Sequence, residues 1–251
     1  MNINQNKKLD NPYVEKYYDA QVASLPGSYA DDRWHSSPVR EFEYQQTARA
    51  LKKALSGCRY EKAIEIGPGD GVWTNIIHEF VTKELHLVEQ STEMFERARS
   101  RLAGLKNVTF ERSDFLTSNP PAENDLIVAV RCFEYFENKE EALKKMRKLL
   151  SPGGRIVIIT KNAELVTSSS VQHHKLHSDQ VSRYDMRRLA ASADLTIMKV
   201  YPAVMRWKAS YAPMRFLFDF LQKVAVWSQG TLVVPFLSAY ATESHVYVMH
   251  A

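Results

Sequence analysis

Cysteine and long apolar runs are scarce in this chain, and each absence narrows the possible protein classes. The 251 residues include only two cysteines, Cys58 and Cys132, and these lack the spacing of metal ligands. No apolar stretch approaches the ~20 residues needed to span a bilayer, and no signal peptide is recognisable. The sequence therefore predicts a cytoplasmic protein whose cysteines are reduced and which does not cross a membrane.

A strong excess of one charge is also missing. Lys and Arg number 33 against 29 Asp and Glu, which leaves a net charge of +4, and the basic residues are scattered along the chain. Charge alone therefore does not indicate nucleic-acid binding. A hydrophobic content of 45% is ordinary for a folded protein, and the length fits one domain with small appended elements.

The most informative stretch is an apolar run that passes directly into a turn with glycines at alternate positions. It reads Ala63-Ile64-Glu65-Ile66-Gly67-Pro68-Gly69-Asp70-Gly71, and the helix-compatible residues 72–80 follow. Glycine permits positive φ and close approach of a ligand to the backbone. A strand, a tight glycine turn and a helix predict a nucleotide-cofactor site at the carboxyl edge of a parallel sheet. The third glycine comes one residue earlier than in G-x-G-x-x-G, which disfavours a dinucleotide.

Further apolar runs end in residues that suit a nucleotide. Residues 85–89 close on Glu89, twenty positions after Gly69, where a carboxylate can accept hydrogen bonds from ribose hydroxyls. Residues 107–115 end in Asp114 and Phe115. A fourth run, a helix and a fifth run follow, at residues 125–130, 139–150 and 156–160, with Ser151-Pro152-Gly153-Gly154 before the last of these. This alternation predicts a parallel sheet with helices on both faces.

These motifs, in this order over about one hundred residues, resemble the class I S-adenosylmethionine-dependent methyltransferases. The resemblance implies an α/β, Rossmann-like, doubly wound sheet of seven strands. The sheet is expected to be mostly parallel, with the last strand antiparallel between the fifth and sixth. The implied cofactor is S-adenosyl-L-methionine.

The resemblance also implies a set of cofactor-binding residues. The three loop glycines would line the methionine and ribose portions, and Glu65 would orient the amino group. Asp114 and Phe115 would hold the adenine, and Tyr18 would reach the methionine end from the N-terminal arm. The full set is Tyr18, Glu65, Gly67, Gly69, Gly71, Glu89, Gln90, Met94, Asp114, Phe115, Val130 and Arg131.

The predicted methyltransferase core comprises residues 38–201 and 245–251, and two segments lie outside it. The first is an N-terminal arm, residues 1–37, rich in tyrosine and containing Arg33-Trp34-His35. One interpretation makes it a lid, with Tyr17 or Tyr18 over the active site. The other packs an amphipathic helix on the outside of the sheet.

The second departure is an insertion at residues 202–244, several times longer than a hairpin loop. Pro213 can open a helix in which Phe216, Phe220 and Val224 share an apolar face with basic flanks. Segment 206–227 is open to three interpretations: a lid over an apolar substrate, a peripheral membrane contact, or a dimer or packing contact.

Catalytic residues are less clearly indicated. His173 and His174 lie where the family places its substrate loop, and Glu134 follows the fourth strand; all three are candidates for a general base. A surface histidine cluster without a role is the alternative. No nearby Asp/Glu pair completes a metal site with His173 and His177, so no metal is expected. Cys132 lacks the context of a nucleophile and is expected in the core.

The predicted activity is methyl transfer to an O or N atom of a small molecule, such as a sugar, a lipid-linked compound or another secondary metabolite. Residues 131–136 lack the Asn/Asp-Pro-Pro-Tyr/Phe motif used on exocyclic amines of adenine or on glutamine. Two alternatives stay open: a non-catalytic cofactor-binding assembly partner and a nicotinamide-dependent oxidoreductase. The methyl acceptor and the oligomeric state do not follow from the sequence.

Overall fold

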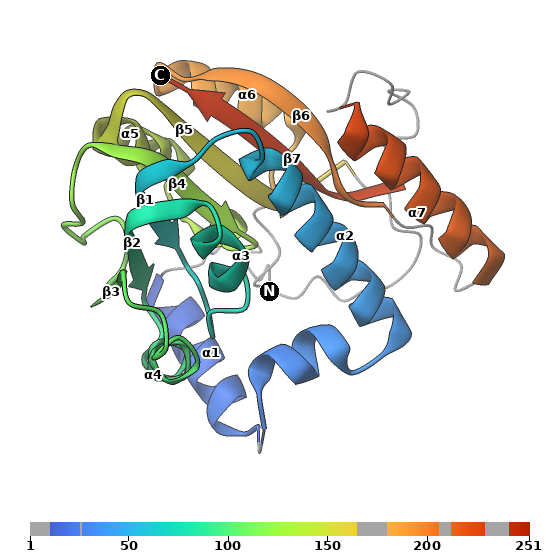
Figure 1. The fold of residues 1–251 in the computed structure, drawn as a ribbon, viewed down its shortest axis with the longest axis horizontal. Helices are drawn as coiled ribbons and strands as arrows, with labels where there is room; N and C mark the ends of the chain where they lie inside the picture. Colours follow the sequence, from blue (N-terminus) through green and yellow to red (C-terminus); the bar gives the residue numbers. More distant parts are fainter. Residues whose placement is uncertain (1–10, 26, 165–179, 206–211, 229–240) are drawn as a thin grey trace, which may run out of the picture.

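A single sheet in the order β3-β2-β1-β4-β5-β7-β6 organises the protein in its computed structural model (Figure 1). The structure describes residues 11–25, 27–164, 180–205, 212–228 and 241–251. The strands are β1 (Tyr60–Ile66), β2 (Val81–Glu89), β3 (Val108–Arg112), β4 (Asn124–Val130), β5 (Leu150–Lys161), β6 (Thr196–Met205) and β7 (Thr242–His250).

Strand directions agree with the expected topology. β1 pairs in parallel with β2 and β4, β2 with β3, and β4 with β5. β7 lies between β5 and β6 and is antiparallel to both, with Val248 opposite Val157 and Val246 opposite Tyr201. The prediction of a seven-stranded sheet with an antiparallel last strand is therefore confirmed. Residues 126–129 of β4 are fully buried because helices cover both faces of the sheet.

Helices flank the sheet on its two faces (Figure 1). Residues of α2, α3 and α4 join the core cluster on one face, and residues of α5 and α6 join the cluster on the other. The helices are α1 (Asn11–Ala23), the π-helical turn η1 (Asp31–His35), α2 (Pro38–Leu55), α3 (Thr74–His78), α4 (Thr92–Arg101), the 3-10 turn η2 (Phe133–Tyr135), α5 (Lys139–Leu149), α6 (Arg183–Ser192) and α7 (Ala212–Trp227).

Serine side chains fix the starts of several helices. Ser182 is the N-cap of α6, and its hydroxyl accepts a hydrogen bond from the backbone N–H of Asp185 (3.0 Å). Ser91 caps α4 in the same way, through the N–H of Met94 (3.2 Å). This second cap matters for function because it places the first turn of α4 beside the end of β2.

Two boundaries differ from the sequence prediction. Helix α3 spans only Thr74–His78, because residues 70–73 form turns that continue the glycine loop. Strand β6 continues past Tyr201 to Met205, where it pairs with Thr242 at the start of β7. Ala203, Val204 and Met205 are buried, so extending the sheet buries apolar side chains that a loop would expose. Both ends of segment 202–244 therefore belong to the sheet.

Helix α7 packs against β6 and α2. Phe218, Gln222 and Ala225 are buried, whereas Phe216 is 81% exposed and Phe220 61%. Gln222 explains the orientation, because its Nε2 donates to the carbonyls of Gln46 (3.2 Å) and Ala203 (3.1 Å). Within the described part of the chain, no helix is both long and apolar enough to traverse a bilayer.

Candidate functional site

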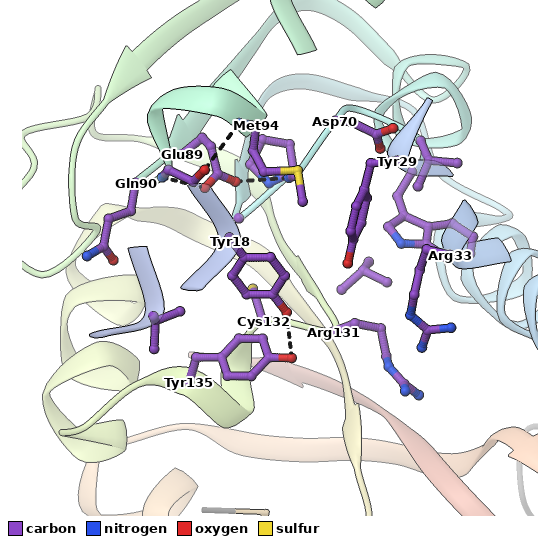
Figure 2. Close-up of a pocket in the computed structure, with 18 of the residues that line it drawn as sticks. Tyr18, Tyr29, Arg33, Asp70, Glu89, Gln90, Met94, Arg131, Cys132 and Tyr135 are labelled. Carbon is purple, nitrogen blue, oxygen red and sulfur yellow. Dashed lines mark hydrogen bonds between the residues drawn. The ribbon is translucent and has the colours of Figure 1, made fainter. Parts of the chain in front are cut away.

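A cavity of about 600 Å³ opens at the carboxyl ends of β1, β2 and β4, and the N-terminal arm lies over it. Its wall includes the glycine loop, the ends of these strands, the first turn of α4 and residues from α1 and η1. Figure 2 shows Glu89 and Gln90 at one end, Arg33 and Arg131 toward the other, and Tyr18 between them.

The glycine loop has a backbone that other residues do not readily adopt. Gly67 and Gly69 have φ angles of +61° and +60°. A Cβ on Gly67 would lie 2.7 Å from the Cβ of Cys132, whose thiol donates to the carbonyl of Ile66 (3.0 Å). Both loop glycines line the cavity. Burial raises the pKa of the Cys132 thiol, so this residue packs beneath the loop as an uncharged group.

Gly71 serves the packing of the loop rather than the wall of the cavity. A Cβ at this position would lie 2.9 Å from the Leu102 side chain at the end of α4, and Gly71 has a φ of +84°. It is not among the lining residues. Gly71 thus lies where the end of α4 approaches the loop closely, and its predicted role toward the cofactor remains a prediction.

Glu89 connects the second strand to the glycine loop. Its Oε2 accepts a hydrogen bond from the N–H of Gly69 (2.9 Å), and its Oε1 accepts one from the N–H of Ser91 (2.9 Å). Burial raises the pKa of Glu89 to about 7, against the opposing effect of these backbone donors. Each oxygen of a carboxylate has further lone pairs, so Glu89 can still accept hydrogen bonds from a ligand.

Glu65 lies at the end of β1 and is 1% exposed. Among the described residues, its Oε2 has no hydrogen-bond partner, and burial raises the pKa of Glu65 to about 8. Glu65 is not among the residues that line the cavity. Its predicted role toward the cofactor amino group remains a prediction, one that an unsatisfied buried carboxylate oxygen supports.

Apolar and polar side chains together complete this end of the cavity. Met94 and Phe115 are 3% exposed, and both line it together with Gln90 and Asp114. The Oδ1 of Asp114 accepts from the N–H of Leu116 (2.9 Å), which fixes the turn after β3. The structure brings these four predicted residues together, with Val130 at the end of β4 also in the wall.

The arm is fastened over the cavity by polar contacts. Asp19 accepts hydrogen bonds from the Ser91 hydroxyl (2.6 Å) and the N–H of Glu93 (3.2 Å), at the start of α4. Arg97 donates to the arm carbonyls of Val22 (2.8 Å) and Leu25 (3.3 Å). The arm therefore rests on α4 and not on the outside of the sheet.

Aromatic residues of the arm face the cavity. The hydroxyl of Tyr18 donates to the hydroxyl of Tyr135 (2.8 Å), which joins α1 to the loop after β4 (Figure 2). Tyr29 makes an edge contact with Tyr18, at 6.4 Å between ring centroids. Trp34 also lines the cavity, whereas His35 is not in the wall and instead contacts Glu41 (2.5 Å). Arg33-Trp34-His35 is thus divided between the cavity and the surface.

Arg131 occupies a backbone position that is unusual for a non-glycine residue. Its φ is +61°, and its N–H donates to the carbonyl of Ile159 (2.7 Å). Its guanidinium makes a bidentate pair with Glu243, with nitrogen–oxygen distances of 2.7 and 3.0 Å. The charge of Glu243 raises the pKa of Arg131, so this cation is permanently charged and already paired.

Three other cations line the same end of the cavity: Arg33, Arg40 and Lys161. Burial lowers the pKa of Arg33, and the nearby charges of Arg131 and Arg40 lower it further. Burial and the Arg131 charge likewise lower the pKa of Lys161, to about 8. These shifts indicate that positive charges are crowded together away from water.

Of the predicted catalytic candidates, the structure places only Glu134 in the cavity wall. Glu134 is 1% exposed; its Oε2 accepts from the Thr160 hydroxyl (2.9 Å), and its Oε1 has no partner among the described residues. His173 and His174 lie outside the described residues. Within the described ranges, no group of three His, Cys, Asp or Glu side chains is arranged to hold a metal ion.

Several lining residues were missed by the sequence reasoning. Asp70 lies inside the glycine motif and accepts from the N–H of Ala30 (2.9 Å), which ties the arm to the loop. Lys161 directly follows the β5 core, so its place at the carboxyl edge of the sheet was a usable signal. Tyr29, Arg40 and Glu43 carried no such signal, because only tertiary contacts bring them to the cavity.

Comparison with known proteins agrees with this geometry. Residues 64–156 match the family model described as a methyltransferase domain. The chain is 24% identical over 214 residues to trans-aconitate 2-methyltransferase of Sinorhizobium fredii (strain NBRC 101917 / NGR234), which covers 82% of each protein.

Two solved structures share the fold. The N-methyltransferase NodS from Bradyrhizobium japonicum WM9, in complex with S-adenosyl-L-homocysteine, has a TM-score of 0.60 at 15% identity, covering 94% of this chain and 96% of that one. The geranyl diphosphate C-methyltransferase from Streptomyces coelicolor A3(2) has a TM-score of 0.63 at 13% identity, covering 95% and 97%. At these identities the likeness concerns the fold.

The residues of this cavity fit S-adenosylmethionine. Two loop glycines leave room at the backbone, Glu89 offers carboxylate oxygens for a ribose, and Phe115 and Met94 form an apolar wall for a base. The matched domain, the similar methyltransferases and the fold agree: residues 64–156 are a methyltransferase domain, the chain has the fold of the class I S-adenosylmethionine-dependent methyltransferases, and S-adenosylmethionine is its cofactor.

Proposed function

We propose that this enzyme transfers a methyl group to an O or N atom of a small molecule enclosed between the glycine loop and the N-terminal arm. The observation that supports this proposal most strongly is that the N-terminal arm covers the cavity. Tyr18, Tyr29 and Arg33 come from the arm and line the same space as Gly67 and Gly69. A volume of about 600 Å³ lies in the range of small-molecule sites.

When bound, S-adenosylmethionine supplies an electrophilic methyl group on its sulfonium sulfur. The chain would hold it with the residues placed at the β2 end of the cavity: Gly67, Gly69, Glu89, Gln90, Met94, Asp114 and Phe115. Val130, Arg131 and Tyr18 would lie toward its methionine end. Methyl transfer is an in-line displacement, so these residues act mainly by orienting the reactants and excluding water.

The arm has the contacts expected of a lid. It is anchored by Asp19 and Arg97 on α4 and by Ala30 on the glycine loop, so it closes over residues that bind the cofactor. A lid that excludes water from the sulfonium and the nucleophile favours the displacement. The name of the similar trans-aconitate 2-methyltransferase, a protein named for a small organic acid, also supports a small-molecule acceptor.

Glu134 is the candidate that this cavity offers for contact with the acceptor. Its free Oε1 can accept a hydrogen bond from an O–H or N–H of the acceptor. The roles proposed for His173 and His174 stay predictions, and so do a peripheral membrane contact of 206–227, a cytoplasmic location and the oligomeric state.

The test is incubation with S-adenosylmethionine carrying a labelled methyl group and an extract of the source cells, followed by separation into organic, small aqueous and RNA fractions. We expect label in a small-molecule fraction, with the organic phase indicating a lipid-linked or apolar acceptor. Label confined to RNA or protein would contradict the proposal. Cofactor binding without any transfer would favour the assembly-partner alternative.

A further inference from the structure

We propose that Arg33 of the N-terminal arm binds the carboxylate at the methionine end of the cofactor, so that an intact cofactor holds the arm closed. This inference rests on the proposed function, which encloses the reactants between the arm and the glycine loop. It adds the contact through which cofactor binding controls closure. The observations behind it are the position of the turn η1 and the pairing of the cations at this end of the cavity.

The two ends of the cavity suit different parts of the cofactor. Glu89 suits the ribose, and the wall that includes Met94 and Phe115 suits the base. Figure 2 shows Arg33 and Arg131 toward the other end. The methionine portion extends from the ribose on the side opposite to the base, so it points toward these guanidinium groups. Its carboxylate is ionised near neutral pH and needs a cation there.

Arg131 is already committed to a carboxylate of the protein. Its guanidinium pairs with Glu243 at 2.7 and 3.0 Å, and the two side chains are only 9% and 6% exposed. A second carboxylate at this guanidinium would lie close to the negative charge of Glu243 and be repelled by it. Arg40 is less suitable because its side chain is 46% exposed, so water screens its charge.

Arg33 provides a buried donor that no described residue uses. Its Nη1 has no hydrogen-bond acceptor among the described residues, and its ion-pair partner Glu43 lies 3.7 Å away. Its guanidinium carbon lies 4.1 Å from the centroid of the Trp34 ring, which holds the side chain in place. Burial lowers the pKa of Arg33, an effect that a bound carboxylate would oppose. The planar guanidinium also matches a carboxylate in shape.

Contacts on both sides of Arg33 fasten η1 to the glycine loop. Before it, the N–H of Ala30 donates to Asp70 (2.9 Å), a residue of the glycine motif. After it, the Trp34 ring makes an edge contact with Trp73, at 5.1 Å between centroids. These contacts bring the Arg33 side chain to the part of the cavity beside the loop, and they depend on the arm lying over that loop.

A contact between the arm and the cofactor makes closure depend on which ligand is bound. S-adenosylhomocysteine carries the same carboxylate as the cofactor, whereas its decarboxylated form keeps the adenosine and the amine. The first ligand can pair with Arg33 in the closed arm, and the second cannot. A ligand shifts a conformational equilibrium only by its difference in affinity for the two states, so the carboxylate favours closure.

The first test pairs a change in the ligand with a change in the protein. Calorimetry measures the dissociation constants of S-adenosylhomocysteine and its decarboxylated form for the parent, Arg33→Gln and Arg33→Lys. Arg33→Gln should weaken binding of S-adenosylhomocysteine about tenfold or more, and Arg33→Lys should recover part of that loss. Neither change should weaken binding of the decarboxylated form.

Two results of this titration would overturn the inference. Equal losses for both ligands would make Arg33 a structural residue. No loss for either ligand would show that another cation holds the carboxylate. If S-adenosylhomocysteine did not bind the parent at all, the proposed function itself would fail, which distinguishes that failure from a failure of the inference alone.

A charge-matched variant separates a direct contact from the general field. Arg40→Gln removes one positive charge from the same end of the cavity but leaves the buried Nη1 of Arg33 in place. It should therefore weaken binding of S-adenosylhomocysteine by less than about threefold. Arg99→Gln, at a largely exposed position of α4, should leave the affinity unchanged. A loss in Arg40→Gln as large as in Arg33→Gln would overturn the inference.

The second test asks whether the carboxylate closes the arm. Chymotrypsin cleaves after tyrosine, so Tyr17 and Tyr18 of α1 report opening, and the Arg33 variants keep these sites. With each ligand at saturating concentration, S-adenosylhomocysteine should slow cleavage of the parent more than its decarboxylated form does. This difference should vanish in Arg33→Gln. Equal protection of the parent by the two ligands would overturn the proposed coupling.

Discussion

The backbone N–H of Gly69 donates to Oε2 of Glu89 over 2.9 Å, so the glycine loop is held by the carboxylate that ends the next strand. The same carboxylate accepts from the N–H of Ser91, the N-cap of α4. One side chain thus connects three segments of the cofactor site: the loop after β1, the end of β2 and the start of α4. Its position is set before any ligand binds, which reduces the ordering that binding requires.

Glu89→Ala and Asp114→Ala are each expected to weaken cofactor binding by tenfold or more, or about 1.4 kcal/mol. The physical reason is the loss of a carboxylate beside the ribose or the adenine, together with loss of the turn that each carboxylate holds. Calorimetric titration with S-adenosylhomocysteine measures the effect. Glu61→Ala, a change at an exposed position of β1, is the control. Unchanged affinity in both variants would refute the site assignment.

Loosening the arm is expected to change ligand retention more than folding. Asp19→Ala removes two hydrogen bonds to the start of α4, so the arm should open more often. We expect faster proteolysis within residues 11–25 and faster release of S-adenosylhomocysteine, with a melting temperature close to that of the parent. Limited proteolysis with and without this ligand is the measurement. Equal cleavage rates in variant and parent would show that the arm is not held by Asp19.

Glu65 is expected to lower the stability of the cofactor-free protein as pH rises. Its pKa is about 8 in the folded protein and about 4.3 when unfolded, so between these values the folded state binds more protons. Stability must then fall with rising pH over this window. Glu65→Gln removes this dependence, and its melting temperature should exceed that of the parent at pH 8 but differ little near pH 4.5.

Glu89, with a pKa of about 7, also makes the stability of the folded protein fall as pH rises, and this smaller dependence remains in the Glu65→Gln variant. Melting curves at pH 4.5, 6 and 8, recorded for both proteins without cofactor, provide the comparison. A parent melting temperature that rose steadily from pH 4.5 to 8 would contradict the burial of Glu65 as an uncharged group.

The sequence alone was sufficient for the sheet and for much of the cofactor site. Alternating apolar runs, the glycine loop and the acid at Glu89 are local patterns, because a strand end and the turn after it are built from neighbouring residues. They predicted the parallel sheet with helices on both faces, whereas the antiparallel last strand and the grouping of Glu89, Met94, Asp114 and Phe115 followed from the family resemblance that these patterns carry. The family match over residues 64–156 rests on the same patterns.

The end of the cavity beneath the N-terminal arm was decided by tertiary structure. Arg131 and Glu243 are 112 residues apart and pair only because β7 inserts beside β5. Arg33 reaches the cavity because the arm folds back over α4, and Gly71 leaves the wall because Leu102 approaches from behind. Charge pairing and burial depend on distance in space, so residues that are remote in sequence determined the charges at this end of the cavity. Backbone motifs are built from neighbouring residues, and for that reason the sequence alone predicted them.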